Sequence, residues 1–576
     1  MKGKVQQKVL VIGEDTRSFL AVIRSLGKAG YEVHVICYDR TSAARGSKYI
    51  RTAKFYNYQS HTQGDWREAV VRLINRYQFD LVIPCDERAL YPLWQEKHRL
   101  PTKTVLAIAN EEALDILFDK WKTKQLAVSC GIPVAEGMKI DPDTVNYDQL
   151  ADKFGDLFVI KPLQSFNQEA LNRRHNVAII HDASDYEGVR CSQSPVMVER
   201  YFSGVGEGVS VFSVDGDVKT VFSHRRDAEP GCGGGSSYRY SIAVDPQQLK
   251  AVEKICKQVR YTGVAMFEFR RDLQSNAWVL VEVNARFWGS LPLAVACGVD
   301  FPRYYADYLL MKSRPETLPK RYPVNYYARS LTADLYHIRS LSGTARGWSK
   351  IIGRFAQYGR IIIGREVIDS YSWSDIRPFC SEVIAIINQL TISLTKKAPV
   401  LLRFRSLFTR YRLKKLFKER PERRMIFICY GNIMRSPFAE EVLKNLLLDQ
   451  SQKLVIESYG FHAPENRQSP KSARQAAQQL NYNLEQHRSR CLRQSDLHSS
   501  DIVFFFDELN KSTLISHYNV SNAFFINDLI PMNKIMSYEV TDPYGLDVEG
   551  VRQCYEQIEL SVKQLINYSK GGLYGR

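Results

Sequence analysis

MIFICYGNIMRSP, residues 425–437, is the stretch that decides the fold of the C-terminal part of the chain. Its apolar start, 425–428, predicts a buried strand, and FAEEVLKNLL (438–447) has the spacing of a helix. Between them lies a short loop that begins with Cys429 and reaches Arg435 six residues later. A loop that leads from a strand into a helix N-terminus favours an anion and a cysteine thiolate. The pattern therefore predicts an α/β unit whose cysteine is either reactive or accidental.

The spacing from Cys429 to Arg435 does not by itself establish a site. A second cysteine with an arginine six residues later, in CGVDFPR (297–303), has no Gly-Asn pair between them and is assigned to chance. After Cys429, Gly431 and Asn432 can adopt left-handed or close-approach backbone angles. Successive amides can then point inward and form a nest for an anion. These residues favour a catalytic loop over a chance cysteine.

The chemistry that suits such a loop is attack by a thiolate on phosphorus. Arg435 can hold two phosphate oxygens with its planar guanidinium group. Ser436 can hydrogen-bond the sulfur of Cys429 and help it to leave later. The attack gives a cysteinyl phosphate that water resolves, and an acid must protonate the leaving oxygen. A phosphatase of this kind therefore requires a carboxylic acid elsewhere in the chain.

CYGNIMRSP resembles the active-site loop of low-molecular-weight protein tyrosine phosphatases, and the resemblance covers about residues 423–570. TDPYG (541–545) resembles the DPY element of that family, whereas an aspartate before a proline is, taken alone, more typical of a turn. The resemblance implies catalytic roles for Cys429, Arg435, Ser436 and Asp542 (the general acid), and substrate contacts for Gly431, Asn432 and Tyr544 (the wall of the slot).

Three other positions bear on this resemblance. His487 and Asp507 fall at positions typical of the family, in which the histidine supports the loop asparagine. Met434 stands where many members have a second cysteine, so the loop is predicted to lack their protective disulfide, and over-oxidation of Cys429 would have no such rescue. The partner that the resemblance implies is a phosphotyrosine protein, for which a bacterial tyrosine kinase is a candidate.

In the front half, polar side chains lie on two strands predicted by the alternation in GVAMFEF and VLVEVNARFWG. Glu268 lies on the first strand, and Glu282 and Asn284 share one face of the second. Two carboxylates and an amide oxygen on one face suit Mg²⁺, or Mn²⁺, held together with nucleotide phosphates. The alternative is a pair of exposed strand carboxylates with no ligand.

FEF, EVNAR, FVIKP and VERYF together resemble the ATP-grasp enzymes, over about residues 1–330. The resemblance implies ATP- and Mg²⁺-dependent joining of a small-molecule carboxylate to an amine through an acyl phosphate. It also implies phosphate contacts for Lys120 and Lys161, adenine-edge contacts for Glu199, Arg200 and Tyr201, a ribose contact for Glu207, metal binding by Glu268, Glu282 and Asn284, and acyl-phosphate stabilisation by Arg286.

The acceptor substrate is the least defined part of this resemblance. WGSLPLA (288–294) is most similar to uncharacterised ATP-grasp carboxylate–amine ligases. His224, Arg225 and Arg226 precede the glycine-rich stretch 231–237 and are predicted to bind the acceptor carboxylate. The alternative for the glycine-rich stretch is a flexible loop without a substrate.

Composition limits the remaining possibilities. The chain has 576 residues and a formal charge of +17, and 401–424 alone hold ten Lys/Arg against two Glu, which is +8. Because the charge is concentrated there, no nucleic-acid partner is predicted for the folded domains. The sequence has no uninterrupted apolar run of about 18 residues, so no membrane-spanning helix is predicted. The N-terminus is typical of a buried strand, and the 11 scattered cysteines favour a reduced, cytoplasmic protein.

The predicted fold class is α/β and multidomain: a pre-ATP-grasp α/β domain (1–112), an ATP-grasp domain of two α+β lobes (113–330), a helical basic linker (331–422) and a parallel-sheet phosphatase domain (423–576). In the linker, Phe404, Leu407, Phe408 and Tyr411 can share a helical face with Leu401, but Leu413, Leu416 and Phe417 drift off it. A helix packed on its neighbours is therefore favoured over contact with a membrane surface. The predicted function is a bifunctional ligase and phosphatase; the alternative is a ligase with a regulatory phosphoprotein-binding module.

Overall fold

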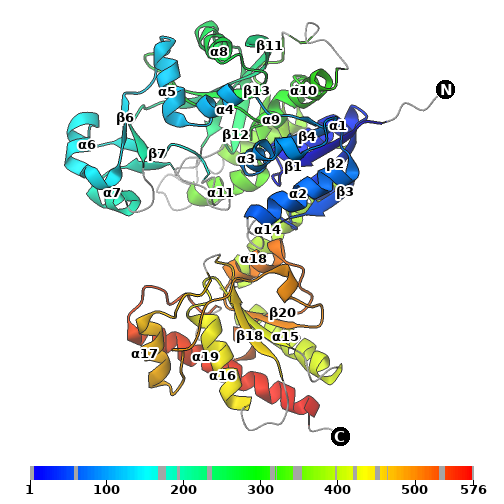
Figure 1. Ribbon diagram of the computed structural model, residues 1–576, viewed down its shortest axis with the longest axis vertical. Coiled ribbons are helices and arrows are strands. Elements are labelled where there is room, and N and C mark those ends of the chain that lie inside the picture. The colour runs from blue at the N-terminus through cyan, green and yellow to red at the C-terminus, as the bar shows by residue number, and fades with distance from the viewer. Residues whose placement is uncertain are drawn as a thin grey trace, which may run out of the picture. The chain divides into compact units, whose positions relative to one another are not determined.

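The computed structural model describes most of the chain, and Figure 1 shows its helices and strands. The described residues are 6–56, 63–166, 177–190, 195–229, 236–311, 318–319, 321–341, 353–395, 399–419, 424–447, 454–462, 465–530 and 539–573. The chain divides near residue 383 into two compact units. Each unit combines helices with β-sheets, which confirms the predicted multidomain α/β class. Within the described ranges, no helix is both long and apolar enough to cross a bilayer.

The first unit begins with a parallel sheet of five strands. Its elements are β1 (Lys8–Ile12), α1 (Ser18–Lys28), β2 (Glu32–Cys37), β3 (Ile50–Phe55), α2 (Gln63–Tyr77), β4 (Leu81–Pro84), α3 (Glu87–Gln95) and β5 (Val105–Leu106). The strand order is β3-β2-β1-β4-β5. The central strands β1 and β4 are short apolar runs that are almost wholly buried, because helices cover both faces of a parallel sheet.

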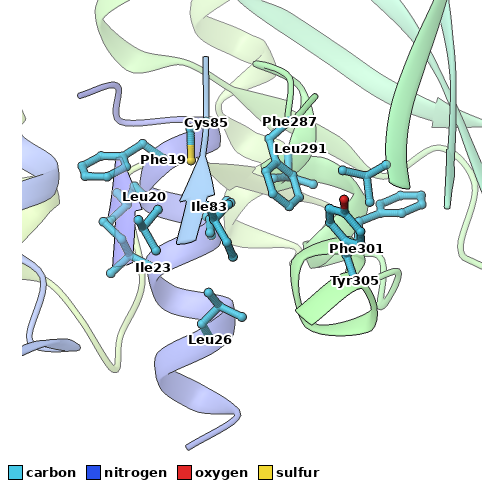
Figure 2. Close-up of a cluster of buried hydrophobic side chains, with 14 of the residues drawn as sticks. Phe19, Leu20, Ile23, Leu26, Ile83, Cys85, Phe287, Leu291, Phe301 and Tyr305 are labelled. Atoms are coloured by element: carbon cyan, nitrogen blue, oxygen red, sulfur yellow. The ribbon is translucent and has the colours of Figure 1, made fainter. Parts of the chain in front are cut away.

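Helix α1 joins this sheet to helices from much later in the chain, α9 (Leu291–Ala296) and α10 (Phe301–Leu309). Figure 2 shows Phe19 and Leu26 of α1, Ile83 of β4 and Phe301 and Tyr305 of α10 in one hydrophobic cluster. The predicted boundary at residue 112 therefore does not separate two hydrophobic cores. The shared core fixes the end of β4 against the segment that follows the predicted metal motif.

A smaller lobe of the first unit has an antiparallel sheet in the order β6-β9-β7-β8, with β6 (Gly137–Ile140), β7 (Phe158–Pro162), β8 (Ala178–Ile180) and β9 (Val196–Arg200). Its helices are α6 (Tyr147–Phe154) and α7 (Ala183–Arg190), whereas α4 (Glu111–Leu117) and α5 (Lys120–Ser129) pack in a core with strands of the larger sheet. The carboxylate of Asp119 accepts hydrogen bonds from the amides of Trp121 and Lys122 and so caps α5. This cap fixes Lys120 as the first residue of that helix.

The largest sheet of the first unit has seven strands: β10 (Val205–Val214), β11 (Asp217–Ala228), β12 (Tyr238–Ile242), β13 (Gly263–Arg271), β14 (Trp278–Asn284), β15 (Tyr327–Arg329) and β16 (Glu366–Ile368). Their order is β14-β13-β10-β11-β12-β15-β16, and α8 (Pro246–Gln258) packs on β10 and β11. Asp215 and Gly216 have φ angles of 50° and 88°, which give the tight turn that joins β10 to β11. In this register Glu268 lies directly opposite Glu282.

The segment predicted as a linker, 331–422, is not one piece. Strand β16 lies within it and pairs with β15, and α11 (Leu331–Leu341) and α13 (Gly359–Ile362) also belong to the first unit. Buried ion pairs attach this part: Arg329 binds Glu366 at 2.6 Å, and Arg239 binds Asp369 at 2.7 Å. A strand of three residues gives too short a pattern for sequence periodicity to detect.

The second unit has a parallel sheet of four strands in the order β18-β17-β19-β20, with β17 (Met425–Cys429), β18 (Ile456–Gly460), β19 (Ile502–Phe505) and β20 (Ala523–Phe525). Its helices include α15 (Pro399–Glu419), α16 (Arg435–Leu447), α17 (Lys471–Gln479), α18 (Glu508–His517) and α19 (Val548–Leu573), and α14 (Arg377–Thr395) precedes them. Cys429 is the last residue of β17 and Arg435 the first of α16. The loop therefore lies at the carboxyl edge of the sheet, where α/β folds place ligand sites.

Candidate active sites

The loop that begins at Cys429 is closed by Asn432. Asn432 has φ +51°, the left-handed conformation predicted for this position, and its amide donates to the Cys429 sulfur at 3.3 Å. Its side-chain amide donates to Ser436 Oγ at 3.0 Å and to Ser458 Oγ at 2.9 Å. One residue thus directs its own backbone amide toward the sulfur and ties the loop to the neighbouring strand β18.

Segment 487–490 supports the same asparagine from outside the loop. The Arg490 amide donates to Asn432 Oδ1 at 2.7 Å, and His487 Nε2 lies 2.7 Å from the Asn432 carbonyl oxygen. Because that partner is a carbonyl, His487 must carry its proton on Nε2. Burial, which is the largest influence, lowers the pKa of His487. A neutral histidine therefore holds the loop backbone.

Arg435 is fixed by several acceptors before any substrate binds. Its Nη1 lies 2.6 Å from Asp507 Oδ2 and donates to the Val540 carbonyl at 2.9 Å, and its Nη2 lies 3.0 Å from Asp542 Oδ2. Burial opposes the guanidinium charge, but Cys429, Asp542 and Asp507 outweigh it and raise the pKa of Arg435. The side chain is therefore a permanent cation beside the cysteine.

Ser436 and Asp542 lie on either side of that arginine. Ser436 Oγ is 3.0 Å from the Cys429 sulfur, within hydrogen-bonding reach. The Asp542 side chain is 50% exposed, so it can meet an incoming group as well as Arg435. The Tyr544 side chain is exposed, and its amide donates to Asp542 Oδ1 at 3.4 Å. The structure thus brings together all of the residues predicted for a phosphatase site.

In the first unit, the predicted metal carboxylates face each other across two strands. The side-chain amide of Asn284 lies 3.3 Å from Glu268 Oε1 and 3.3 Å from Glu282 Oε1, so it bridges the pair. Arg226 Nη2 lies 2.7 Å from Glu268 Oε2. Burial, the largest influence, raises the pKa of Glu268, and the charge of Glu282 adds to that effect while Arg226 opposes it. Two half-buried carboxylates that face each other in this way favour a bound cation.

A cleft borders Glu282 and Asn284, and Lys120, Ser165 and Glu87 are among its other lining residues. Lys120 Nζ is 3.1 Å from Ser165 Oγ. Burial raises the pKa of Glu282, but Lys120 and Lys161 outweigh it, so the pKa of Glu282 is lowered. Both predicted phosphate lysines therefore act on the same carboxylate.

Lys161 is held on its other side by Glu199. The carboxylate of Glu199 is almost fully buried and contacts Lys161 through one oxygen and Lys124, at 2.5 Å, through the other. The opposing lysines outweigh burial and lower the pKa of Glu199. The side chain of Glu199 is thus engaged by lysines, which leaves the backbone of this segment as the part suited to an adenine edge.

Arg286 lies at the junction of the shared core. Its Nη2 is 2.9 Å from Glu87 Oε1, and α3, which begins at Glu87, directly follows β4. Arg286 Nε and Glu87 Oε2 are buried and have no hydrogen-bond partner among the described residues. Buried polar atoms of this kind normally have partners. These two unsatisfied atoms, one on each residue of the Arg286–Glu87 ion pair, therefore point toward a polar ligand.

Two predicted contacts, those of Glu207 and Arg225, need correction. Glu207 is only 1% exposed, and its carboxylate binds Arg225 at 2.7 Å, Arg271 at 2.9 Å and Gln248 at 2.8 Å. Side chains alternate along a strand, so Glu207 and Arg225 lie on the sheet face opposite to Glu268. Glu207 is therefore not placed for a ribose, nor Arg225 for an acceptor beside the metal pair.

His224 and Arg226 lie on the same face as Glu268, and two glycines make room for them. A Cβ on Gly208 would be 2.2 Å from the His224 ring, and one on Gly206 would be 2.7 Å from Arg226 Cδ. Burial, followed by the neighbouring arginines, lowers the pKa of His224 well below its usual value. His224 is therefore neutral, which argues against the prediction that it pairs with the acceptor carboxylate. Of the three residues predicted for this contact, Arg226 remains the candidate.

The remaining predicted positions contribute less. Arg200 pairs with Glu136 at 3.0 Å, and its side chain is 50% exposed, so it points away from the buried lysines. Tyr201 is half-buried and directly follows β9. Most of the glycine-rich stretch 231–237 lies outside the described residues.

Two family models match the chain, one in each unit. The model "Low molecular weight phosphotyrosine protein phosphatase" matches residues 424–570, and "ATP-grasp in the biosynthetic pathway with Ter operon" matches residues 192–330. The low molecular weight protein-tyrosine-phosphatase PtpB of Staphylococcus epidermidis is 31% identical over 137 residues, which cover 23% of this chain and 91% of that protein. Through its second unit, the chain belongs to the low molecular weight protein tyrosine phosphatases. An ATP-grasp domain precedes this phosphatase domain.

Two further similarities complete the comparison. The protein-arginine-phosphatase of Bacillus subtilis is 24% identical to the phosphatase domain over 148 residues, which cover 25% of this chain and 96% of that protein. The crystal structure of an L-amino acid ligase from Bacillus licheniformis has a TM-score of 0.41 and 15% identity, and covers 55% of this chain and 78% of its own.

The structure also places residues at both sites that the motifs did not contain. In the phosphatase domain, Arg467 Nη2 donates to the Gly431 carbonyl at 2.5 Å. In the ATP-grasp unit, Glu87 lines the cleft. The guanidinium group of Arg17 covers Gly289, because a Cβ atom added to that glycine would be 3.1 Å from Arg17 Cζ. Asp86 and Glu87 directly follow the apolar strand β4, which is a sequence signal for the carboxyl edge of a parallel sheet. Arg467 gives no comparable signal.

Proposed function

We propose that this chain is a bifunctional enzyme. Its phosphatase domain hydrolyses phosphotyrosine through a cysteinyl phosphate, and its ATP-grasp unit joins a carboxylate to an amine with ATP and Mg²⁺. The observation that carries the proposal is the closed loop in which Cys429, Asn432 and Ser436 lie within hydrogen-bonding distance beside Arg435. That arrangement supplies a nucleophile, an anion nest and a fixed cation in one place.

In the proposed hydrolysis, the Cys429 sulfur attacks phosphorus, and the bond from phosphorus to the tyrosine oxygen breaks. Asp542 donates its proton to that leaving oxygen, and the loop amides and Arg435 bind the other phosphate oxygens. Water then attacks phosphorus and passes a proton to Asp542, while the sulfur leaves with a hydrogen bond from Ser436. The distances of 3.0 Å from Arg435 to Asp542 and from Ser436 to the sulfur support these roles.

The exposed rim of the phosphatase site supports an aromatic substrate. Tyr544 is 70% exposed beside Asp542 and suits a wall against a phenyl ring. Arg467 adds a positive charge near the loop. Burial lowers the pKa of its guanidinium group, and the nearby Cys429 and Tyr544 oppose that shift. The proposed substrate is a tyrosine-phosphorylated protein, for which a bacterial tyrosine kinase is one candidate.

The ATP-grasp unit has donors that fit Mg²⁺ and nucleotide phosphates. Glu268, Glu282 and Asn284 offer hard oxygen ligands on one face, and Lys120 and Lys161 lie near them. When bound there, Mg²⁺ would offset the charge of the transferred phosphoryl group. Mn²⁺ has the same preference for oxygen ligands and is an alternative. Binding of a cation at Glu268 would also free Arg226 from its ion pair.

The substrate acid would bind among arginines near the same cleft. Arg226 and Arg286 are paired with carboxylates, and so is Arg239. The guanidinium of Arg17 makes no ion pair or hydrogen bond within the described residues, so it is the cation best placed to take the charge of a substrate. Arg286, with an unsatisfied Nε, would then stabilise the acyl phosphate.

The phosphatase proposal is tested by Cys429→Ser. The purified chain should hydrolyse p-nitrophenyl phosphate, and the variant should lose all measurable turnover because an alcohol is a far weaker nucleophile than a thiolate. Cys380→Ser, at an exposed cysteine of the first unit, is the matched control and should keep full activity. Turnover that survives in Cys429→Ser would overturn the mechanism. A variant that is inactive yet fully functional in cells would instead favour a phosphoprotein-binding module.

The ligase proposal is tested by ADP release with a panel of acids and amines, with products read by mass spectrometry. Release should require Mg²⁺ and vanish in Glu282→Ala, whereas Asp217→Ala, at a strand carboxylate that is 74% exposed, should leave it unchanged. Release in Glu282→Ala at the rate of the unaltered chain would contradict the metal role.

A further inference from the structure

Helix α15 is part of the phosphatase unit and binds it through its polar side. Asp528, which is 3% exposed, accepts hydrogen bonds from Arg405 at 2.7 Å and Thr409 at 2.8 Å, and its carbonyl accepts one from Ser406 at 2.5 Å. Further along the same side, Leu413 is buried against the phosphatase core. The helix is therefore fixed to the second unit by a buried carboxylate and a short apolar anchor.

The opposite side of α15 is apolar and exposed. Phe404 is 66% exposed, Leu407 61%, Phe408 61% and Tyr411 68%. Their spacing of three and four residues places them on one face over two helical turns. We name these four residues the α15 face. Apolar residues on the outer side and a polar residue network on the inner side reverse the usual arrangement of a surface helix.

Positive charge continues the α15 face in both directions. Arg403 precedes it, Lys415 lies one turn after Tyr411, and Lys418 follows three residues later, and all three side chains are exposed. The chain has no Asp or Glu from residue 399 to residue 418. Apolar side chains and cations thus share one side of the helix, and the one acidic residue of the helix is Glu419 at its end.

We propose that the α15 face docks on an anionic lipid surface. Aromatic and aliphatic side chains with flanking lysines and arginines are what a helix needs to lie in the headgroup region of an anionic bilayer. The face offers no polar group at its centre for directional hydrogen bonds, whereas its long basic side chains can adapt to mobile headgroups. These features favour a fluid anionic surface over a structured protein partner.

Docking on a lipid surface also revises the sequence prediction for α15. The drift of Leu413 off the apolar face favours a helix packed on its neighbours rather than on a membrane. In the structure Leu413 belongs to the opposite, anchoring side, so it does not interrupt the α15 face. The helix is both packed on the phosphatase unit and apolar on its outer side.

Flotation of the full chain with vesicles tests the proposal. The chain should float with vesicles of phosphatidylglycerol and phosphatidylcholine at low salt and remain behind with phosphatidylcholine alone. Leu407→Ser with Phe408→Ser should abolish flotation. Replacement of Arg403, Lys415 and Lys418 by Glu should weaken binding at least about tenfold, because each cation near an anionic surface adds roughly 1 kcal/mol.

Two controls keep the test specific to this face. Ile362→Ser with Ile363→Ser changes two residues that are 89% and 67% exposed on the first unit and should leave flotation unchanged. Hydrolysis of p-nitrophenyl phosphate should survive in every variant, because none of these residues belongs to the catalytic loop, and shows that the unit is folded.

Three results would overturn the proposal. The first is failure of the unaltered chain to float with anionic vesicles. The second is equal flotation of the Leu407→Ser, Phe408→Ser variant. The third is a chain that does not float but self-associates through this face, seen as a dimer in sedimentation that the same variant abolishes, which would assign the face to a second copy of the chain.

Discussion

Arg435 shows at the scale of one residue how the phosphatase site is prepared. Asp507, Asp542 and the Val540 carbonyl fix its guanidinium group, so little rotational freedom is lost when a phosphate arrives. Asp507 also caps α18 by accepting from the Asn510 amide at 2.7 Å. The same carboxylate therefore links the orientation of the arginine to the start of a helix.

Asp542→Asn should separate the two proposed roles of this aspartate. The amide keeps the size of the side chain and can still accept from Arg435, but it has no proton to give. Turnover of a phosphotyrosine peptide should fall about 10²–10⁴-fold. Turnover of p-nitrophenyl phosphate, whose leaving group needs less protonation, should fall less, as steady-state kinetics on the two substrates would show. Equal losses on both would argue against a general acid.

His487 should make the phosphatase unit sensitive to acid. Burial lowers the folded-state pKa, whereas the unfolded value is about 6.5. Above that pH the His487 side chain is neutral in both the folded and the unfolded chain, and its contribution to stability is fully present. As the pH falls below that value, the unfolded chain binds the proton first, so the free energy of unfolding decreases. His487→Gln should flatten this decrease in urea midpoints followed by residual phosphatase activity at one fixed assay pH. The exposed His498→Gln is the matched control and should leave it unchanged.

At the scale of elements, the catalytic loop depends on one left-handed residue. Asn432→Gly keeps access to φ +51° but loses the bonds to Ser436 and Ser458. Asn432→Ala loses the same bonds and adds strain of about 1 kcal/mol or more. The alanine variant should therefore inactivate at a lower temperature than the glycine variant and retain less activity. Identical thermal inactivation of the two would show that backbone strain is not what asparagine relieves.

The elements also explain how far sequence reasoning reached. The strands and the Cys429 loop could be predicted because periodicity and loop residues act locally. The prediction that His224, Arg225 and Arg226 form one site fails for Arg225, because consecutive strand residues cannot share a face and Arg225 points away with Glu207. Arg17 and Asp369 reach the ATP-grasp core only through tertiary packing, which leaves no local pattern.

At the scale of the whole molecule, the two units should respond to different ligands. All seven tryptophans precede residue 384, so tryptophan fluorescence reports on the first unit alone. MgADP should raise the temperature of the fluorescence transition. At a hundredfold excess over its Kd, the bound nucleotide should stabilise the first unit by about 2.7 kcal/mol. Inorganic phosphate should instead delay thermal loss of phosphatase activity. A shift of the fluorescence transition by phosphate would contradict this separation.

The buried ion pairs beyond residue 330 decide where this chain can be cut. A fragment that ends there loses Glu366 and Asp369, and it leaves the guanidinium groups of Arg329 and Arg239, both almost fully buried, without their carboxylates. An uncompensated buried charge costs about 3–5 kcal/mol, a large part of the stability of an ordinary domain. A fragment of the ATP-grasp half should therefore be stable only if it runs to about residue 383, well beyond residue 330, where the match to the family model ends.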